Sequence, residues 1–346
     1  MQTKTKILNW AIFGTGRIAN RFVDSFKFLD KEVSDLNKVY AVASRKLESA
    51  KSFAEKFNIQ NFETYDNLVK DPKIDIVYIA SPHNIHYQGI KLCLEHGKHV
   101  LCEKPITTSF KELQELIALA KSKSLFLMEA MKTPLTPLYD ELSKILGSGV
   151  LGEITYLRAE AARKMPYHDD SRLFKTDLAG GALLDVGVYG LFLSLFLAKC
   201  LGLSFKPELL NVNSHFSKED KVDLSNDILM RFGENLNVNL FSSISHNLTR
   251  EAYIGGTKGL IKIEDFIAPT KMQLNLYKDI NFGIDGYDLE TKDYDFELQG
   301  SALQYNVSHI SDCFSKGLTQ SPIMSHSMSL ELQALLEEVK LKTTII

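Results

Sequence analysis

The chain has 346 residues, of which 45% are hydrophobic and 24% charged, and its formal net charge is −3. This length suits two domains and the composition is ordinary for a globular protein, whereas the small net charge gives no reason to expect binding to nucleic acid or an anionic membrane. The four cysteines are widely spaced without a CxxC pair, which favours reduced thiols in a cytoplasmic protein over disulfides or a zinc site.

The first third of the chain alternates between strand and helix patterns. Apolar strands are predicted at 7–13, 38–43, 76–80, 99–102 and 125–128, and helices at 47–57, 86–96 and 109–121. The first strand is too short for a signal peptide or a membrane span. This alternation predicts a doubly wound parallel (Rossmann) sheet, and we assign residues 1–130 to a dinucleotide-binding domain.

After residue 131 the pattern changes to short runs of alternating polar and apolar residues. Strands of this kind are predicted at 154–161, 208–216, 227–232, 237–243 and 260–263, with helices starting near Asp185 and at 328–342. The apolar run 188–198 is too short to span a membrane. Residues 131–346 are therefore expected to form an α+β domain with an open, mainly antiparallel sheet, for substrate binding and oligomerisation.

A glycine motif follows the first strand, Gly14-Thr15-Gly16-Arg17-Ile18-Ala19. Gly14 permits a tight turn, Gly16 lets the backbone approach a pyrophosphate, and Ala19 is small enough for close packing of the helix on the strand. The amides at the start of that helix would face the phosphates. A GxGxxA motif alone is weak evidence. At the first strand–helix junction of a chain that alternates strands and helices, however, it predicts dinucleotide binding.

The second strand ends in Ala43-Ser44-Arg45-Lys46, where an NAD enzyme would place an acidic residue. The Ser44 hydroxyl and the Arg45 guanidinium can bind a 2′-phosphate, so NADP is expected, with NAD possible. The alternative is that Arg45 and Lys46 are a solvated helix start.

The third strand ends in Ser81-Pro82-His83-Asn84-Ile85-His86, at a position that normally borders the nicotinamide. His83 and His86 are expected to line the cofactor or substrate site. The alternative is that each histidine is a structural hydrogen-bond donor.

The tripeptide Glu103-Lys104-Pro105 comes directly after the next apolar strand. A lysine at the carboxyl end of such a strand faces the crevice where ligands bind, and the proline restricts the backbone before it. Taken alone, the tripeptide could equally be an ordinary loop sequence that ends the strand.

A further run, Gly180-Gly181-Ala182-Leu183-Leu184-Asp185-Val186-Gly187-Val188-Tyr189, carries an acid and a phenol. Asp185 and Tyr189 are four residues apart, so on an α-helix they would share one face and form a proton-transfer pair. The alternative is that Asp185 favours the helix dipole while Tyr189 lies in the core.

No metal site is expected. The nine histidines include no HExxH, and no Cys/His cluster has zinc spacing. His168-Asp169-Asp170 could be read as ligands but is better explained as an exposed polar loop. The sequence also lacks the GxSxG elbow of a hydrolase.

The order and spacing of these motifs resemble the Gfo/Idh/MocA family of NAD(P)-dependent oxidoreductases over nearly the whole chain. Arg172-Leu173-Phe174 also fits the family. The form Gly-Ala-Leu-Leu-Asp-x-Gly-x-Tyr is most similar to the branch of dimeric dihydrodiol dehydrogenase, glucose–fructose oxidoreductase and xylose dehydrogenases.

The resemblance implies a role for each motif. Lys104 would orient the substrate oxygen beside the nicotinamide, Tyr189 would be the acid/base, and Asp185 would help to place the substrate. Substrate contacts are expected from Lys104, Arg172, Asp185 and Tyr189. Cofactor contacts are expected from Gly14, Thr15, Gly16, Arg17, Ile18, Ser44, Arg45, Ser81, Pro82, His83, His86, Glu103 and Lys104.

One segment departs from the family pattern. After Met128-Glu129-Ala130-Met131, relatives of this branch commonly have Trp-x-Arg, whereas this chain has Lys132-Thr133-Pro134. An aromatic ring and a guanidinium that would border the site are replaced, which leaves the substrate open.

The sequence therefore predicts a cytoplasmic, NADP-preferring oxidoreductase of a sugar, polyol or related diol. A homodimer or higher oligomer through the second domain's sheet is expected from the family, with no nucleic-acid or membrane partner. Two alternatives are a non-catalytic NAD(P)-binding sensor and a reductase of imines or tetrapyrroles on the same fold.

Overall fold

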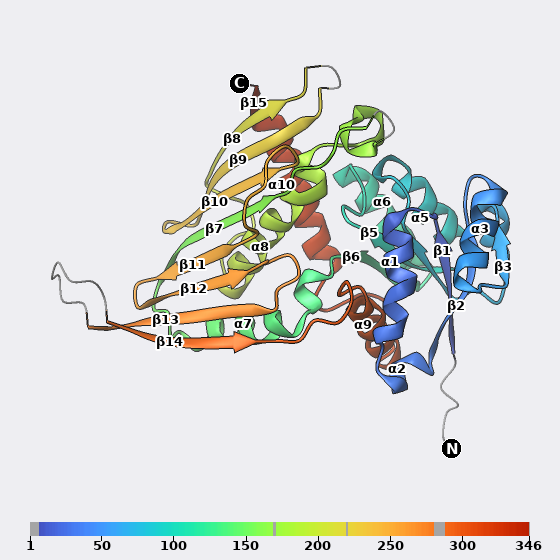
Figure 1. Ribbon diagram of the computed structural model, residues 1–346, viewed down its shortest axis with the longest axis horizontal. Coiled ribbons are helices and arrows are strands. Elements are labelled where there is room, and N and C mark those ends of the chain that lie inside the picture. Colours follow the sequence, from blue (N-terminus) through green and yellow to red (C-terminus); the bar gives the residue numbers. More distant parts are fainter. Residues whose placement is uncertain (1–6, 169–170, 219–220, 280–287, 346) are drawn as a thin grey trace. The chain divides into compact units, whose positions relative to one another are not determined.

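The computed structural model describes residues 7–168, 171–218, 221–279 and 288–345. The chain divides into two compact units, Met1–Leu135 with Gln299–Leu330, and Thr136–Leu298 with Glu331–Ile346 (Figure 1). The chain first passes from one unit to the other after Leu135, close to the predicted boundary at residue 130. The return of 299–330 to the first unit differs from the predicted division.

Long-range hydrogen bonds account for that return. The Asn37 side-chain amide donates to the Ser311 hydroxyl at 2.8 Å, and His326 Nε2 donates to the Leu127 carbonyl at 3.0 Å. These partners are about 200 or more residues apart in sequence, so no local pattern could indicate them.

The first unit is built on a six-stranded sheet in the order β3-β2-β1-β4-β5-β6, and every pair in it is parallel. This is the order of a dinucleotide-binding fold, with its topological switch between β1 and β4. The strands are β1 (Leu8–Phe13), β2 (Asn37–Ala43), β3 (Asn61–Glu63), β4 (Ile76–Ile79), β5 (His99–Glu103) and β6 (Leu127–Ala130).

Helices connect these strands and cover the sheet. They are α1 (Arg17–Ser25), η1 (Phe26–Phe28), α2 (Lys31–Ser34), α3 (Leu47–Phe57), α4 (Tyr65–Leu68), η2 (His83–Ile85), α5 (His86–Glu95), α6 (Phe110–Ser122), η3 (Thr133–Leu135), α9 (Gln304–Ser315) and the first residues of α10 (His326–Lys342).

Strand β1 is buried on both faces, as expected for a parallel strand between helical layers. Trp10 packs against Phe22 of α1, with ring centroids 5.6 Å apart. Ala11 and Phe13, which point to the opposite face, join the core cluster that contains Ile90 of α5 and other residues of α5 and α6. The apolar strand pattern therefore produces the predicted doubly wound sheet.

The second unit contains a nine-stranded sheet in the order β14-β13-β12-β11-β7-β10-β9-β8-β15. Among the described strands only the pairs β10–β7 and β15–β8 are parallel, so the predicted mainly antiparallel sheet is confirmed. Its strands are β7 (Ile154–Ala162), β8 (Leu209–Phe216), β9 (Asp223–Phe232), β10 (Leu236–Ser243), β11 (Ala252–Gly256), β12 (Gly259–Glu264), β13 (Lys271–Asp279), β14 (Asp288–Asp295) and β15 (Thr343–Ile345).

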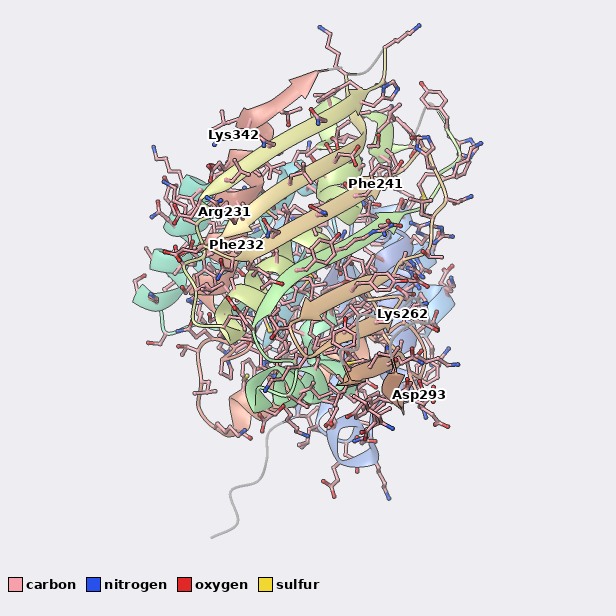
Figure 2. All side chains as sticks on the ribbon, turned by 90° about the vertical axis from the view of Figure 1, so that its left-hand side faces the viewer. Arg231, Phe232, Phe241, Lys262, Asp293 and Lys342 are labelled. Atoms are coloured by element: carbon pink, nitrogen blue, oxygen red, sulfur yellow. The ribbon has the colours of Figure 1, made fainter. Side chains whose placement is uncertain are left out.

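Helices pack on one face of this sheet. They include α7 (Pro137–Ser148), α8 (Val188–Cys200) and most of α10, with short turns η4 (Arg172–Phe174), η5 (Thr176–Leu178) and the π-helical turn η6 (Leu183–Gly187). Figure 2 looks onto the opposite face, where Arg231, Phe241 and Lys262 extend from β9, β10 and β12. No helix among the described residues of this unit covers that face.

The helical stretch Thr176–Cys200 is long and apolar enough to cross a membrane by length and composition, with a mean hydropathy of 1.9. The run 188–198 was predicted to be too short for this, because the turns that precede α8 were not included. In the structure 78% of the apolar window is buried inside the protein. The core helix of a globular unit gives the same pattern, so the stretch is weak evidence for a membrane span.

Candidate active site

The glycine turn joins β1 to α1 as the sequence predicted. Gly14 has φ +118°, and a Cβ on it would lie 2.8 Å from the Ala80 carbonyl oxygen. Only glycine fits a turn that is both left-handed and this close to the neighbouring strand end. A Cβ on Gly16 would meet no described atom within 4 Å. The start of α1 therefore has room for a phosphate group, and these residues fit a dinucleotide.

The end of β2 lies beside a tyrosine that the sequence reasoning did not single out. The Tyr65 ring stacks on Phe13, with centroids 3.7 Å apart and planes 7° from parallel. Burial raises the pKa of Tyr65, while the Arg45 charge and a hydrogen bond with Ser44 oppose the rise. Tyr65 thus lies next to the two residues predicted to bind a 2′-phosphate. Its position at the start of α4, just after a three-residue strand, was the only available indication.

The loop after β4 contains a buried hydroxyl and two histidines. Ser81 Oγ has no hydrogen-bond partner among the residues that the structure describes, which fits a place where a ligand supplies one. His83 is 4% exposed, and its ring centroid lies 5.5 Å from that of His86.

His86 is fully buried and connects two loops. Its Nε2 lies 3.0 Å from the Ser81 carbonyl oxygen, and its Nδ1 lies 3.0 Å from the Pro105 carbonyl oxygen. Carbonyl oxygens only accept, so the ring N–H of either neutral tautomer donates to one of these two carbonyls. The two nitrogens of this predicted cofactor residue are directed at protein carbonyls, and the ring joins the loop after β4 to the loop that carries Lys104.

The loop of Glu103, Lys104 and Pro105 is buried at the carboxyl end of β5, and Lys104 is 9% exposed. Tyr78 of β4 donates a hydrogen bond to Glu103. Burial raises the pKa of Glu103, whereas that bond and the charges of Lys104 and Lys132 oppose the rise. The predicted lysine is therefore part of a buried network of charges.

The segment that departs from the family pattern also belongs to this network. Lys132 Nζ donates to the Ser301 carbonyl oxygen at 2.9 Å, and its charge lowers the pKa of Glu103. Thr133 and Pro134 are buried in η3. Lys132 thus places a cation close to Glu103, at a position where the family resemblance led us to expect an aromatic ring.

In the second unit, the two glycines of the predicted motif make room for other groups. A Cβ on Gly180 would lie 2.5 Å from the Leu173 carbonyl oxygen, and one on Gly181, with φ +104°, would lie 1.9 Å from Asp223 Oδ1. Asp223 accepts hydrogen bonds from the Leu183 amide at 2.6 Å and the Asn226 side chain at 2.7 Å. Asp223 was not predicted, because it lies 40 residues from the turn that it holds.

Asp185 and Tyr189 were predicted to share one face of an α-helix. Asp185 lies instead in the π-helical turn Leu183–Gly187, and Tyr189 lies in the first turn of α8. The spacing of an α-helix therefore does not apply between them. At Gly187 a Cβ would meet Ser242 Oγ at 2.9 Å, so the turn lies close against β10.

Asp185 is paired with Arg172, which was also predicted to bind substrate. Arg172 Nη2 lies 3.0 Å from Asp185 Oδ1. Its Nη1 is buried and has no hydrogen-bond partner within the described ranges. The Nη1 group of Arg172 can therefore donate a hydrogen bond to a further acceptor while Nη2 stays paired with Asp185.

The structure describes no group of three or more His, Cys, Asp or Glu side chains that could hold a metal ion. Asp169 and Asp170, which were weighed as ligands, lie outside the described residues.

The structure brings the predicted cofactor residues and Lys104 together at the carboxyl ends of the parallel strands. In the second unit it brings Arg172 and Asp185 together. This fold and these two residue sets define the class of nicotinamide-nucleotide oxidoreductases.

Comparisons with known proteins agree with this class. The family "Oxidoreductase family, NAD-binding Rossmann fold" matches residues 8–131, and the "GFO/IDH/MocA C-terminal domain" matches residues 139–262. Trans-1,2-dihydrobenzene-1,2-diol dehydrogenase is 35% identical in Mus musculus over 335 residues and 32% identical in Homo sapiens over 336 residues, with 96% of each chain covered. The chain belongs to the Gfo/Idh/MocA family and is an NAD(P)-dependent dehydrogenase, and the expected branch is confirmed.

Solved structures with the same fold share less sequence. A 3-ketoreductase from Actinomadura kijaniata, in complex with NADP and TDP-benzene, has a TM-score of 0.84 at 23% identity over 99% of both chains. An aldose-aldose oxidoreductase from Caulobacter crescentus, complexed with glycerol, has a TM-score of 0.81 at 22% identity over 97% of both chains. These likenesses confirm the architecture of both units.

Proposed function

We propose that this dehydrogenase prefers NADP and oxidises or reduces a hydroxyl or carbonyl carbon of a diol, sugar or polyol. The observation that carries the proposal is the buried Lys104, which extends from the end of β5 in the unit that holds the glycine turn. The vicinal diol in the names of the relatives supports the substrate class. Ser44, Arg45 and the neighbouring Tyr65 support the preference for NADP.

A bound nicotinamide supplies or accepts the hydride. Tyr189, as the phenolate, takes the hydroxyl proton as the carbon loses hydride, and as the phenol it returns the proton in the reverse direction. The Lys104 ammonium donates a hydrogen bond to a substrate oxygen and stabilises negative charge that develops on it. The substrate thus loses one hydride and one proton and becomes a carbonyl compound.

The pair of Arg172 and Asp185 orients the substrate. Asp185 accepts a hydrogen bond from a second hydroxyl of the substrate, while the buried Nη1 of Arg172 donates to a substrate oxygen. A molecule with two neighbouring hydroxyls uses both groups, which favours a diol or sugar over a simple alcohol.

We also infer a cytoplasmic homodimer. The four cysteines are free, as is usual in a reducing compartment. The open sheet face exposes Leu209 by 45% and Leu229 by 46%, and a second copy would cover these leucines. The regulatory and imine- or tetrapyrrole-reductase alternatives gain no support from a described contact.

The function is tested with Lys104→Met. We expect this variant to bind NADP as tightly as the wild type and to lose at least about 100-fold in kcat on a trans-diol, because methionine keeps the length but not the hydrogen-bond donor. Binding is measured by fluorescence titration, and turnover by absorbance of the reduced nicotinamide.

The matched control is Lys51→Met, which replaces a lysine of α3 whose side chain is 60% exposed. It should keep wild-type turnover. Full activity of Lys104→Met on every diol, sugar and polyol tried would overturn the proposal.

A further inference from the structure

Glu129 is a buried carboxyl with no assigned part in the proposed reaction. It lies in β6 and is 2% exposed. Its Oε1 accepts a hydrogen bond from the Ile106 amide at 3.1 Å, and its Oε2 accepts one from the Ser329 hydroxyl at 2.8 Å. Burying a carboxyl is costly unless its oxygens are hydrogen-bonded, so both bonds help to keep it in place.

The Ile106 bond ties Glu129 to the loop of Lys104. Ile106 follows Lys104 by two residues, and Tyr78 of β4 holds Glu103 on the other side of the lysine. Strands β4 and β6, the two neighbours of β5, thus each fix one end of the segment that presents Lys104. A shift of the loop backbone would move the ammonium away from the reacting oxygen.

The carboxyl and the lysine also interact through their charges. Burial raises the pKa of Glu129 to about 7, and the bonds from Ser329 and Ile106 and the charge of Lys104 oppose the rise. Since the Lys104 charge favours the Glu129 carboxylate, the carboxylate equally favours the charged form of Lys104.

Other titratable groups face Glu129. The Glu103 carboxyl, next to Lys104 in sequence, raises the pKa of Glu129. Burial and both carboxyls raise the pKa of the Cys102 thiol well above its usual range, which keeps the thiol neutral. His326, one turn before Ser329 on α10, directs its Nε2 to the Leu127 carbonyl oxygen. Glu129 and Glu103 are therefore the two acidic neighbours of Lys104 in this network.

We propose that Glu129 is a positioning residue for Lys104, which fixes the loop through the Ile106 amide and provides an anionic neighbour for the ammonium. The proposal rests on the function proposed above, in which Lys104 acts on the substrate oxygen. Glu129 itself contacts neither substrate nor cofactor in this account.

The test compares Glu129→Gln with Glu129→Asp. Glutamine keeps the size and an acceptor oxygen but removes the charge. We expect kcat/KM to fall about tenfold, a loss typical of a misplaced catalytic group, with NADP affinity within about twofold of the wild type. The pH midpoint for trace acetylation of Lys104, measured by peptide mass spectrometry, should fall by about half a unit or more. Aspartate keeps the charge and should restore the midpoint, although not the full kcat.

Two controls separate charge from packing. Ser329→Ala removes one hydrogen bond but leaves Glu129 ionised at alkaline pH, where lysine is acetylated, so the acetylation midpoint should not move. Glu55→Gln removes an exposed charge of α3 and should change neither quantity. Acetylation needs no turnover, so it still tests the link to Lys104 if the proposed function fails. A wild-type midpoint together with wild-type kcat/KM in folded Glu129→Gln would overturn the proposal.

Discussion

Arg45 and Ser44 lie at the end of β2, where a dinucleotide of this fold places the ribose that carries the 2′-phosphate of NADP. Ser44 is fixed by its amide, which donates to the Glu63 carbonyl at 3.3 Å. Tyr65, stacked on Phe13, borders the same residues. Ser44, Arg45 and Tyr65 thus offer three donors to a 2′-phosphate, a group that NAD lacks.

Replacing Arg45 with alanine tests this view. We expect the Kd for NADP to rise about 10- to 100-fold, because a charge-assisted hydrogen bond to phosphate is lost, while the Kd for NAD changes little. Isothermal titration with each cofactor measures both constants.

Lys51→Ala, on the exposed side of α3, serves as the control and should leave both constants unchanged. An equal loss for NAD and NADP, or a wild type that binds NAD as tightly as NADP, would show that Arg45 does not recognise the phosphate.

The residues that local patterns could reveal are those next to strand ends. Gly14, Ser81 and Lys104 each follow a short apolar run, and the carboxyl ends of parallel strands meet at one edge of a sheet. Glu129 and Asp223 were missed because their role depends on partners 23 and 40 residues away. A buried acid in a strand gives no sign of its partner in the sequence.

At the scale of elements, the turn from Gly180 to Gly187 depends on close contacts that only glycine permits. Gly181 has a positive φ and lies against the Asp223 carboxylate, which in turn accepts from the Leu183 amide. Asp185 follows Leu183 by two residues, so the geometry of the turn determines where its carboxylate lies.

Gly181→Ala should therefore destabilise the protein by more than about 3 kcal/mol, since it combines backbone strain with a clash against the half-buried Asp223 carboxylate. Urea unfolding followed by circular dichroism measures the change in the free energy of unfolding.

Gly149→Ala is the matched control. Gly149 has φ +73° at the end of α7, but a Cβ there would meet no described atom within 4 Å. The Gly149→Ala substitution introduces backbone strain without a clash, so it should lower the free energy of unfolding by only about 1–2 kcal/mol. Equal losses in the two variants would mean that Asp223 does not constrain Gly181.

Several elements of the second unit could not be predicted. Strands β13 and β14 pair with each other but are separated in sequence by residues 280–287, which lie outside the described part. Strand β15, near the end of the chain, pairs with β8. The π-helical turn was taken as part of an α-helix because residue spacing alone does not separate the two. Strands with one apolar face, such as β8, were predicted because alternate residues are buried.

At the scale of the whole molecule, the open face of the nine-stranded sheet exposes apolar side chains that a second copy could cover. Leu209 and Leu229 are exposed on the neighbouring strands β8 and β9, and Phe241 lies on the adjacent β10 (Figure 2). Exposed leucines on two neighbouring strands of an open sheet face favour an interface there.

If a second copy covers this face, the wild type should sediment as a dimer at micromolar concentration and Leu229→Glu should sediment as a monomer. A buried unpaired carboxylate at an interface is costly. Leu318→Glu changes a leucine of the first unit that is 38% exposed and should remain dimeric. A monomeric wild type at these concentrations would rule out the dimer.

The most direct measurement of the central claim is a single turnover in a stopped-flow instrument. Enzyme saturated with NADP⁺ is mixed with a trans-diol, and absorbance of the reduced nicotinamide is followed. The account predicts a burst of one reduced cofactor per active site in the wild type and at least about 100-fold slower reduction in Lys104→Met with NADP⁺ still bound. Reduction at the wild-type rate in Lys104→Met would contradict the account.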